Sequence, residues 1–519
     1  MIFNINTDKN YKNYLSKIDI CIIGSGLSSA SLVYGLRKSN LNILLIEQGN
    51  FKNNYSNKNL NTEIFRKNCD VDPLYNRAIG GNNNLWHGII AEYDNLDFIS
   101  RNYLDNSEWP ISKKHIQKYY DKAKTFLIGS PKKLKSNYKY LLKSNSLINK
   151  VYAAKNKKID TRDFILKLCN SSNNFHLIYN LRVNEIKKNK NKTDAEYLIG
   201  SNTLSDKKIK VYAKQFIICC NGIATPELLL NSESIIRSFT KNMRSFLGSC
   251  LMDHPKCSFG KVDLRGFKIS DLYSDRHYKK FFLRQGFKLN PKKTNYKKIP
   301  NHTFFFRPAY SLDEFYFEDF KNNFYLLVNY LMTGRRSKLS GKLNFLNLTS
   351  LKNFPNIIKY MTYKRSKKFK YQYAELFVNL EQIPSKKNKV YISKKDRNEY
   401  NYHKCKINWK ISKEDFDGYI EIFNKLKLEL EKLKIPVIMK SKSQIWKSLL
   451  SSHAYHYLGT CRMSNNKNTG IVDKNLKIHT SSNIYICDGS VLTTGGSVNP
   501  VLTVSALALR LSDHLMQKK

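Results

Sequence analysis

The chain has 519 residues, enough for two or three compact domains or for one large doubly wound domain with an insertion. Its 89 Lys and Arg residues against 41 Asp and Glu give a formal net charge of +48, which raises nucleic acid, an anionic membrane or an anionic substrate as a partner. Because the lysines are scattered and the rich Asn, Ile, Tyr and Phe content is typical of an AT-rich genome, we expect no nucleic acid partner and keep polyanion binding as an alternative.

Segments for export, membrane insertion or disulfide bonding are not evident. The first residues, MIFNINTDKNY, hold no apolar run of signal-peptide length, and no window approaches the apolar length of a membrane-spanning helix. The ten cysteines form no C-x-x-C pair and several lie inside apolar runs, which indicates packed thiols rather than a disulfide or zinc framework. We therefore expect a cytoplasmic protein without a metal centre.

The first recognisable unit lies between residues 18 and 47. An apolar run at 18–23 predicts a buried strand, and the sequence GSGLSS at 24–29 follows it. A helical stretch at 30–38 and a second apolar run at 42–46 come next, and this run ends in Glu47. A strand, a glycine turn, a helix and a strand with an acid about 20 residues after the turn is the arrangement of a Rossmann-like dinucleotide-binding fold.

Each residue of this turn has an expected task. Gly24 permits the tight turn, and Gly26 lets the backbone approach a pyrophosphate that also faces the N–H groups of the helix N-terminus. Ser29 stands where the third glycine of a G-x-G-x-x-G motif is usual, and it is still small enough for the helix to pack against the strand. Glu47 would accept hydrogen bonds from the adenosine ribose.

The middle of the chain alternates strand patterns with less regular segments. The sequence RAIGGNNNLWHG at 77–88 predicts an irregular loop that presents backbone and amide groups at close range. Residues 373–380 predict a strand and residues 411–433 a helix. Residues 335–370 carry apolar side chains at roughly helical spacing among many basic ones, which favours a helix packed on its own domain. Contact with an anionic membrane or an acidic electron acceptor is the alternative.

The last stretch carries the strongest pattern. It contains HYLGTCRM from His456, a β-branched run at 484–487 that ends in DGS, and a glycine pair that leads through Asn499 and Pro500 into an apolar segment. Asn is a good N-cap and Pro a good first helical residue, so a helix is expected to begin there. Its apolar surface predicts burial, with the electropositive N-terminus facing a ligand that carries or acquires negative charge.

This ending, H-x-x-G-T-C-R-M … D-G-S … S-x-N-P … A-L-A-L, resembles the signature of the glucose-methanol-choline (GMC) oxidoreductases, which are FAD enzymes that oxidise alcohols. The G-G-x-x-x-x-W-x-G loop, the TPELLL sequence at 225–230 and the DHP at 253–255 resemble the family too. The resemblance implies an α/β fold with a discontinuous Rossmann-like FAD-binding domain, residues 1–256 and 451–519. An inserted α+β substrate-binding domain built on an antiparallel sheet would span residues 257–450.

The resemblance also assigns expected roles around FAD. Val183 would meet the adenine, and Asp488 would accept from the ribityl chain beside the helix that starts at Pro500. Members that attach the flavin through histidine carry it directly before the loop tryptophan, where this chain has Leu85, so we expect non-covalent FAD. The expected cofactor contacts are Gly24, Gly26, Ser29, Glu47, Gly80, Gly81, Asn84, Trp86, Val183, Asp488, Gly489 and Pro500.

For catalysis the family pairs a histidine at H-x-x-G-T-C with a second His or Asn before the final helix, which here are His456 and Asn499. Histidine suits proton abstraction near neutral pH. His453 is the competing base, capping of the helix is the alternative role for Asn499, and His254 of the DHP is interpreted as structural. The loop and the GGSVNP ending look most like members that oxidise sugars and polyols, so the expected substrate is a carbohydrate hydroxyl.

Two matters stay open from the sequence. The electron acceptor could be oxygen, a quinone or a carrier protein. A flavoprotein with a non-redox role, either lyase-like or in binding, is the alternative function, since the resembled family includes lyases.

Overall fold

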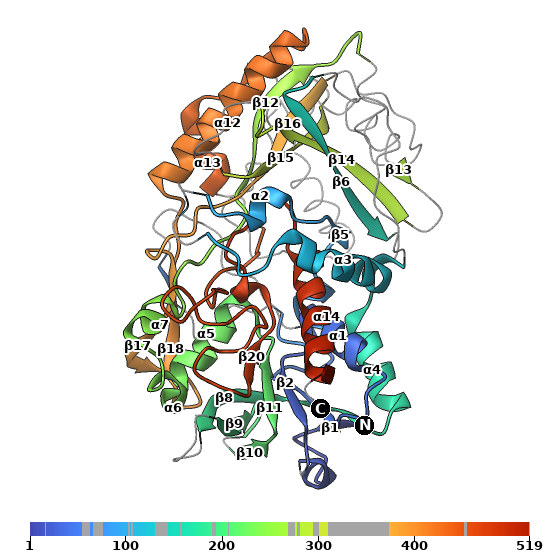
Figure 1. Ribbon diagram of the computed structural model, residues 1–519, viewed down its shortest axis with the longest axis vertical. Helices are drawn as coiled ribbons and strands as arrows, with labels where there is room; N and C mark the ends of the chain where they lie inside the picture. Colours follow the sequence, from blue (N-terminus) through green and yellow to red (C-terminus); the bar gives the residue numbers. More distant parts are fainter. Residues whose placement is uncertain are drawn as a thin grey trace, which may run out of the picture.

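The computed structural model describes most of the chain (Figure 1). The residues outside the description are 16, 54–62, 66–75, 102–103, 105–106, 130–143, 156–157, 189–193, 206, 268–275, 278–280, 294–299, 310–372, 451–453 and 518–519. The basic segment 335–370 and the competing base His453 therefore lie outside the described residues.

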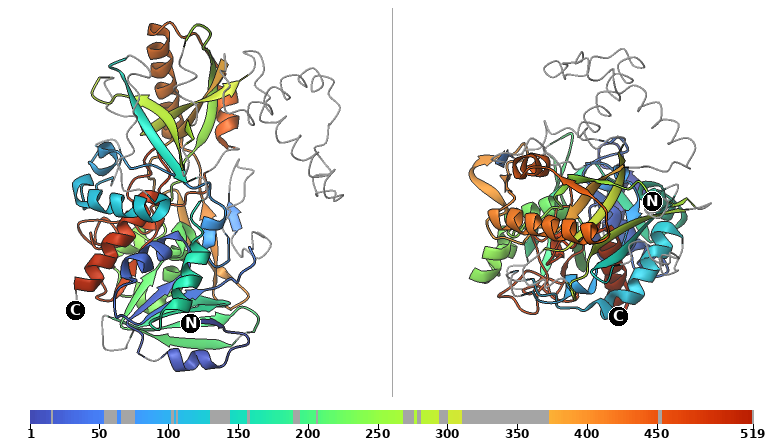
Figure 2. Two further views of the ribbon diagram at one scale, coloured as in Figure 1. Left: turned by 90° about the vertical axis from the view of Figure 1, so that its right-hand side faces the viewer. Right: turned by 90° about the horizontal axis from the view of Figure 1, so that it is seen from above.

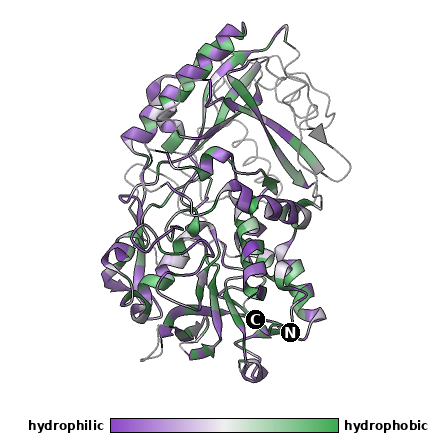
Figure 3. Ribbon diagram, in the orientation of Figure 1, coloured by the Kyte–Doolittle hydropathy of each residue, from purple (hydrophilic) through white to green (hydrophobic). Residues whose placement is uncertain are grey.

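The lower half of the molecule in Figure 1 is built on a six-stranded parallel sheet. Its strand order is β1 (Ile2–Asn4), β7 (Phe175–Tyr179), β3 (Ile43–Glu47), β2 (Ile20–Ile23), β11 (Gln215–Ile218) and β20 (Ile484–Ile486). All residues of β2, β3 and β20 are buried, which is why these strands are continuous apolar runs rather than alternating ones. Figure 3 shows the apolar colouring concentrated in them.

Helices and a small sheet cover this parallel sheet. The packed helices are α1 (Leu27–Leu36), α14 (Val501–Gln517), α3 (Lys113–Ile128) and α4 (Thr161–Ser171), and α1 and α14 contact each other closely. An antiparallel meander of β8 (Leu181–Lys188), β9 (Ala195–Asn202) and β10 (Lys208–Tyr212) contacts β3 through β8. The sheet is thus buried by elements from both ends of the chain.

The upper half holds an eight-stranded antiparallel sheet. Its order is β19 (Val437–Met439), β12 (Lys256–Asp263), β16 (Tyr373–Leu380), β15 (His302–Ala309), β14 (Phe281–Leu289), β6 (Leu147–Lys155) and β5 (Ile89–Ile90), with β13 (Arg276–His277) beside β14. Helices α12 (Lys413–Lys432) and α13 (Lys442–Leu450) pack against β19 and β12. Ser412 and Asp415 form a capping box that begins α12, and its apolar face joins a separate hydrophobic core.

A third group of elements lies beside the parallel sheet. It contains β17 (Lys389–Arg397), β18 (His403–Asn408) and β4 (Glu63–Phe65), with α5 (Asn221–Asn231), α6 (Glu233–Ile236) and α7 (Lys241–Phe246) near them in Figure 1. The remaining short elements are α2 (Asn95–Phe98), η1 (Asn10–Tyr14), η3 (Gly81–Asn84) and η4 (Gly489–Val491). The left view of Figure 2 shows the two halves stacked along the long axis.

The α/β fold class with an added antiparallel sheet is confirmed. The domain boundaries stay a prediction, because β5 and β6 join the antiparallel sheet from before residue 257 and β17 contacts α5. Helix α1 begins at Leu27 rather than at residue 30, since the Gly26 carbonyl already accepts the first helical bond from Ala30 N–H.

The described residues include most of the cysteines and the helices in which a membrane span could be sought. The nine cysteines there are free thiols, and Cys69 lies outside the description. No helix in the described part of the chain has the length and apolar content needed to cross a bilayer. The cytoplasmic location stays a prediction.

Candidate active site

A cavity of about 1610 Å³ is lined by residues of both sheets. Pockets for single small ligands commonly measure about 300–1,000 Å³, so this one has room for a dinucleotide and a substrate together. The carboxyl ends of β2, β3, β11 and β20 contribute one side, and β12, β14, β15 and β16 contribute the other. Ligands of open parallel sheets bind beyond the carboxyl ends of the strands, and the cavity lies there.

The turn between β2 and α1 has the geometry of an anion cradle. Gly24 has φ +98°, and a Cβ there would lie 2.6 Å from the Cys219 carbonyl oxygen, so only glycine fits. A Cβ on Gly26 would meet no atom within 4 Å, because this backbone borders the cavity. Gly26 caps α1 without any side-chain acceptor, which leaves the first N–H groups of the helix for a ligand. The residues present therefore fit a dinucleotide pyrophosphate.

Two buried carboxylates border the same end of the cavity. Glu47 accepts hydrogen bonds from Ser25 N–H (3.1 Å), Ser25 Oγ (2.7 Å) and Gly49 N–H (2.9 Å). Asp488 accepts from Ser490 N–H (2.8 Å), Asn221 N–H (3.0 Å) and Thr225 Oγ1 (2.6 Å). Both carboxylates also line the cavity, where they can accept from a ligand hydroxyl. Burial raises the pKa of both groups, and these hydrogen bonds oppose the rise.

The glycine loop after residue 77 passes over this cavity. It is not wholly irregular as expected, because Gly80 at φ +94° turns the chain into the single 3-10 turn η3. Lys158 Nζ donates to the carbonyl oxygens of Asn83 (3.4 Å), Asn84 (2.9 Å) and Trp86 (3.1 Å) and so holds the loop. The sequence contained no signal for this lysine, which lies about 70 residues away from the loop in the chain.

The predicted cofactor contacts divide into two groups. Those that line the cavity are Gly24, Gly26, Glu47, Gly81, Trp86, Val183, Asp488, Gly489 and Pro500. Ser29, Gly80 and Asn84 do not: Ser29 Oγ donates to the Gly24 carbonyl (2.7 Å), and the Asn84 amide donates to the Ile79 carbonyl (3.1 Å) and Asn53 Oδ1 (2.9 Å). These two side chains hold the turn and the loop in shape. Trp86 Nε1 is buried without a hydrogen-bond partner, as an unpaired donor beside a ligand site would be.

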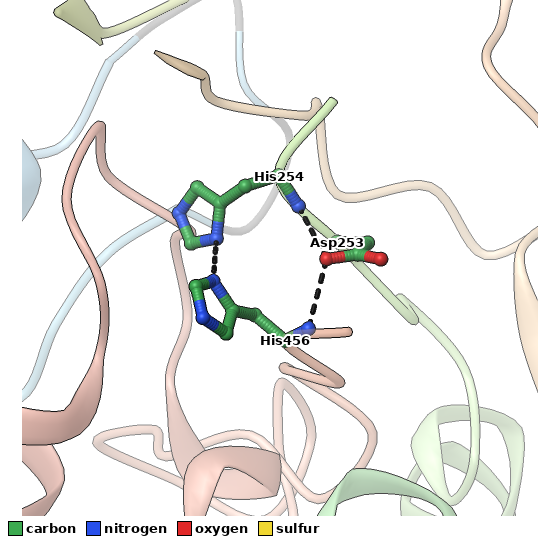
Figure 4. A group of neighbouring side chains, drawn as sticks. All are labelled: Asp253, His254 and His456. Atoms are coloured by element: carbon green, nitrogen blue, oxygen red, sulfur yellow. Dashed lines mark hydrogen bonds between the residues drawn. The ribbon is translucent and has the colours of Figure 1, made fainter. Parts of the chain in front are cut away.

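His456 forms a pair with His254 (Figure 4). Their Nδ1 atoms are 2.9 Å apart, and Asp253 Oδ1 accepts from the backbone N–H of both residues, at 2.7 Å from His254 and 2.9 Å from His456. An isolated antiparallel β-bridge between Met252 and Leu458 brings the chain segments of His254 and His456 together. His456 lines the cavity, whereas His254 is fully buried behind it.

The hydrogen bonds fix the tautomers of both rings. His254 Nε2 lies 2.9 Å from the Gly495 carbonyl oxygen and 3.1 Å from that of Gly496, and since carbonyls only accept, Nε2 carries the proton. Burial lowers the pKa of His254, so its ring is neutral and its Nδ1 is an acceptor. His456 Nδ1 must then donate, which leaves Nε2 of His456 as the basic nitrogen. Figure 4 shows this nitrogen pointing away from His254.

The same cluster could be considered for a metal, because ligand atoms of Asp253, His254 and His456 lie within 4.8 Å of one another. Two nitrogens on one tetrahedral Zn²⁺, each at about 2.0–2.1 Å, would be roughly 3.3 Å apart. The 2.9 Å separation and the backbone N–H groups on Asp253 fit a hydrogen-bonded pair instead.

Burial is the main cause that lowers the pKa of His456 well below its ordinary value, and the electrostatic effects of the neighbouring His254 and Lys256 act in the same direction. The imidazole is therefore neutral at and below neutral pH and can accept a proton there. A base with a low pKa has less driving force for proton transfer, so this site must stabilise the transferred proton by other contacts. His254 Nδ1 supplies one, because it accepts a stronger bond from a charged His456.

Asn499 lies at the cavity without capping α14. The helix begins at Val501, one residue later than expected, because Pro500 already provides the carbonyl that Val504 N–H bonds at 2.9 Å. Asn499 Nδ2 donates to the Ile89 carbonyl (3.2 Å), which fixes the amide and leaves its oxygen with no donor from the described residues. This side chain can accept a hydrogen bond from a ligand.

The carbonyls that face His254 are themselves held by buried charges that the sequence did not reveal. Glu381 forms a bidentate ion pair with Arg101, at 2.6 and 2.7 Å, and also accepts from the backbone N–H of Gly496 (3.2 Å) and Asn301 (2.7 Å). Tyr93 donates to the Gly495 carbonyl. Arg101 lies 280 residues from its partner Glu381 in the chain, so no local pattern links the two residues.

A second set of charges adjoins this pair. Asp94 accepts from Lys288 Nζ at 2.8 Å and from Lys150, and the two lysines hold the pKa of Asp94 low against the opposing effect of burial. Burial and the negative charges of Asp94 and Glu381 raise the pKa of Asp97 to about 6. Asn301 Nδ2 donates to Asp97 at 2.7 Å, so the two sets are continuous. The network joins α2 and the antiparallel sheet to the Gly495–Gly496 turn.

Known proteins share both the sequence of the carboxyl-terminal region and the overall fold. The family model described as GMC oxidoreductase matches residues 384–508. Residues 384–508 are thus similar to the carboxyl-terminal region of the GMC oxidoreductases. The resemblance to this family inferred from the sequence is thereby confirmed.

Curated relatives match over a short segment. A 2-methyl-1,2-propanediol dehydrogenase from Mycolicibacterium austroafricanum is 42% identical over 64 residues, 12% of each chain. A 6'''-hydroxyparomomycin C oxidase from Streptomyces lividus is 42% identical over 57 residues, 11% of this chain and 10% of the other. A fructose dehydrogenase large subunit from Gluconobacter japonicus is 34% identical over 61 residues, which are 12% of this chain and 11% of the other. The match spans about a tenth of the length of these relatives.

Solved structures match over nearly the whole chain. Pyridoxine 4-oxidase from Mesorbium loti superposes with a TM-score of 0.54 at 12% identity, over 96% of this chain and 99% of the other. A variant formate oxidase from Aspergillus oryzae, studied for its FAD modification, superposes with a TM-score of 0.53 at 14% identity, over 96% of this chain and 98% of the other. At these identities the likeness concerns the fold, which agrees with the family assignment of the carboxyl-terminal region.

Proposed function

We propose that the chain is an FAD-dependent enzyme that oxidises a CH–OH group of a small alcohol. The observation that carries this proposal is a single cavity that joins a dinucleotide-type glycine turn to a neutral histidine whose basic nitrogen is defined by its hydrogen bonds. When bound, FAD supplies the hydride acceptor. Residues of this chain abstract the proton, orient the substrate and bind the cofactor.

His456 Nε2 takes the hydroxyl proton of the substrate, and His254 holds the ring so that this nitrogen remains the free one. The second N–H of the Asn499 amide donates to the oxygen of the same hydroxyl, which fixes the orientation of the reacting C–H bond. The N-terminus of α14, at Val501, lies at the cavity and favours negative charge in the cofactor when it is reduced. Glu47, Asp488 and the α1 N-terminus hold the cofactor.

FAD is bound without a covalent bond in this proposal, because Leu85 offers no nucleophile before Trp86. His87 also lines the cavity, but it follows Trp86 in the chain instead of preceding it. Precipitation of the purified yellow protein with acid should leave the flavin in the supernatant. Colour that stays with the pellet after washing would contradict non-covalent binding.

A sugar or polyol hydroxyl is the proposed substrate. The fructose dehydrogenase subunit, the propanediol dehydrogenase and the aminoglycoside oxidase among the relatives support this choice, as does the GGSVNP ending. An anaerobic screen of sugars, polyols and simple alcohols against the flavin-loaded protein tests it. Bleaching of the flavin absorbance by at least one compound is expected, and a flavin that none of them reduces would favour the non-redox alternative.

A further inference from the structure

One wall of the cavity, opposite the glycine turn, contains polar groups without partners. Lys256 and Ser258 lie on β12, and Asn379 lies on the adjacent strand β16, where it pairs in register with Lys256. Ser258 Oγ and Asn379 Oδ1 are buried and have no hydrogen-bond partner in the part of the chain that the structure describes. The side-chain ammonium of Lys256 forms no ion pair or hydrogen bond with the residues that the structure describes, although the charge of Asp253 acts on it.

Unpaired polar groups of this kind are uncommon in native interiors, and each one requires a ligand, an ion or water to explain it. A cation, a hydroxyl and an amide oxygen on two neighbouring strands form a mixed set of donors and acceptors. The ammonium and the hydroxyl donate, whereas the amide oxygen of Asn379 can only accept. A ligand that satisfies all three therefore carries both oxyanion and hydroxyl oxygens.

The charge of the wall supports the same ligand. Arg284, Arg307 and Lys440 also line this side of the cavity, and Glu375 is the only carboxylate among the described residues there. A positive wall attracts an anionic substrate before any contact forms.

The position of Lys256 links this wall to the reaction. It follows His254 by two residues, and its positive charge lowers the pKa of His456. When His456 takes a proton, it and Lys256 would both carry a positive charge at the cavity and would repel each other. An anion bound to Lys256 removes this repulsion and lets the imidazole hold the proton.

We propose that Lys256, Ser258 and Asn379 form a substrate subsite for an oxyanion group, a carboxylate or a phosphate, carried by a hydroxylated substrate. The proposal rests on the proposed function, because it names the class of alcohol that the same cavity oxidises. The oxyanion accepts from Lys256 and Ser258, and a neighbouring hydroxyl donates to Asn379. The substrate is then an acidic sugar or polyol rather than a neutral one.

The experiment uses the FAD-loaded protein and pairs of compounds that differ in one charged group. These pairs are glucuronate with glucose, gluconate with sorbitol, and glucose 6-phosphate with glucose. Anaerobic flavin reduction should proceed with a kcat/KM at least about ten-fold higher for an acidic member, and the first two pairs against the third separate carboxylate from phosphate. Neutral members that reduce the flavin as well as their acidic partners do would overturn the proposal.

Lys256→Met keeps the length of the side chain and removes its charge. It should lower kcat/KM for the acidic member by about ten-fold or more, mainly through KM, and leave the neutral member within about two-fold. Lys387→Met, at an exposed lysine of the same insertion that does not line the cavity, is the matched control and should change neither value. An equal loss with both members would assign Lys256 to the reaction itself and contradict the subsite.

Binding without turnover separates the two proposals. Gluconate should quench the flavin fluorescence with a Kd at least about ten-fold lower than that of sorbitol at fixed ionic strength, and Lys256→Met should abolish the difference. If gluconate binds in this way but no compound reduces the flavin, the oxidase function fails and the subsite stands. If neutral alcohols reduce the flavin and acids do not bind more tightly, the subsite fails and the function stands.

Discussion

The two halves of the molecule are held together by different interactions. The parallel sheet is almost wholly apolar inside, and its strands β2 and β3 are neighbours both in sequence and in space. The antiparallel half depends at its base on buried charges, where Arg101 meets Glu381 and two lysines meet Asp94. Deletion of a single methyl group from the parallel half should therefore lower the free energy of unfolding only slightly. In the antiparallel half, removal of one member of a buried ion pair leaves the other charge buried without its partner.

The largest effect is expected where the two halves meet, at His456. His456→Ala removes the proposed base, and loss of a general base costs about 10²–10⁴-fold in rate, roughly 3–5 kcal/mol of barrier. The loss should appear in anaerobic stopped-flow flavin reduction and not in reoxidation, while the variant still purifies yellow. Because burial and its neighbours keep the pKa of His456 low, the parental rate should fall only well below pH 6.5.

Two further variants make this test decisive. Asn499→Ala should slow the same step, and the double variant should be less than additive since both groups act on one hydroxyl. His479→Ala, whose ring contacts Ser464 away from the cavity, is the control and should reduce at the parental rate. If His453→Ala abolishes reduction while His456→Ala does not, the base has been assigned to the wrong histidine.

The next effect concerns stability in the charged half. Arg101→Met leaves Glu381 buried without its partner, which should lower the free energy of unfolding by about 3–5 kcal/mol. The double variant Arg101→Met with Glu381→Leu should recover much of this loss, because it leaves no unpaired charge. Urea denaturation followed by circular dichroism measures both values. A single variant within about 1 kcal/mol of the parent would mean that the network adds little to stability.

A smaller effect is expected on the cofactor side. Glu47→Ala removes an acceptor for the adenosine ribose, and hydrogen bonds to charged groups contribute about 1.5–3 kcal/mol, so FAD affinity should fall by about ten-fold or more. Titration of the apoprotein with FAD gives the Kd. Glu196→Ala, at an exposed glutamate of β9 outside the cavity, should leave that Kd unchanged. An unchanged Kd for Glu47→Ala would contradict the assignment of the glycine turn.

The smallest change belongs to the apolar half. Ile22→Val deletes one methyl group from the fully buried strand β2 and should cost about 0.5–1.5 kcal/mol of stability. Flavin reduction by any substrate should stay at the parental rate, since this side chain packs inside the sheet. A loss as large as that of Arg101→Met would show that the two halves do not differ in the way described here.

The same difference explains what could be predicted from the sequence. The order of β2, α1 and β3 and the position of Glu47 at the end of β3 were predicted, although α1 begins three residues earlier than expected, because the contacts of this unit lie within 30 residues and a local pattern defines them. His254 was interpreted only as structural, because its contact with His456 bridges about 200 residues and no local pattern encodes it. Lys158, Arg101 and Glu381 were missed for the same reason. The start of α14 was misplaced by one residue, since hydrogen-bond geometry and not residue preference decides that boundary.

The order of strands in the parallel sheet has a consequence for biosynthesis. β11 pairs with β2 on one side and with β20 on the other, and roughly 265 residues of chain separate β11 from β20. At a translation rate of about 5–20 residues per second, the ribosome needs about 13 to 53 seconds to make that length. During this interval the nascent sheet has an open, apolar edge at β11, which is a template for pairing with other chains. The antiparallel half, whose strands 256–439 emerge within the interval, can fold first, and chaperone binding is expected to concentrate on the unfinished sheet.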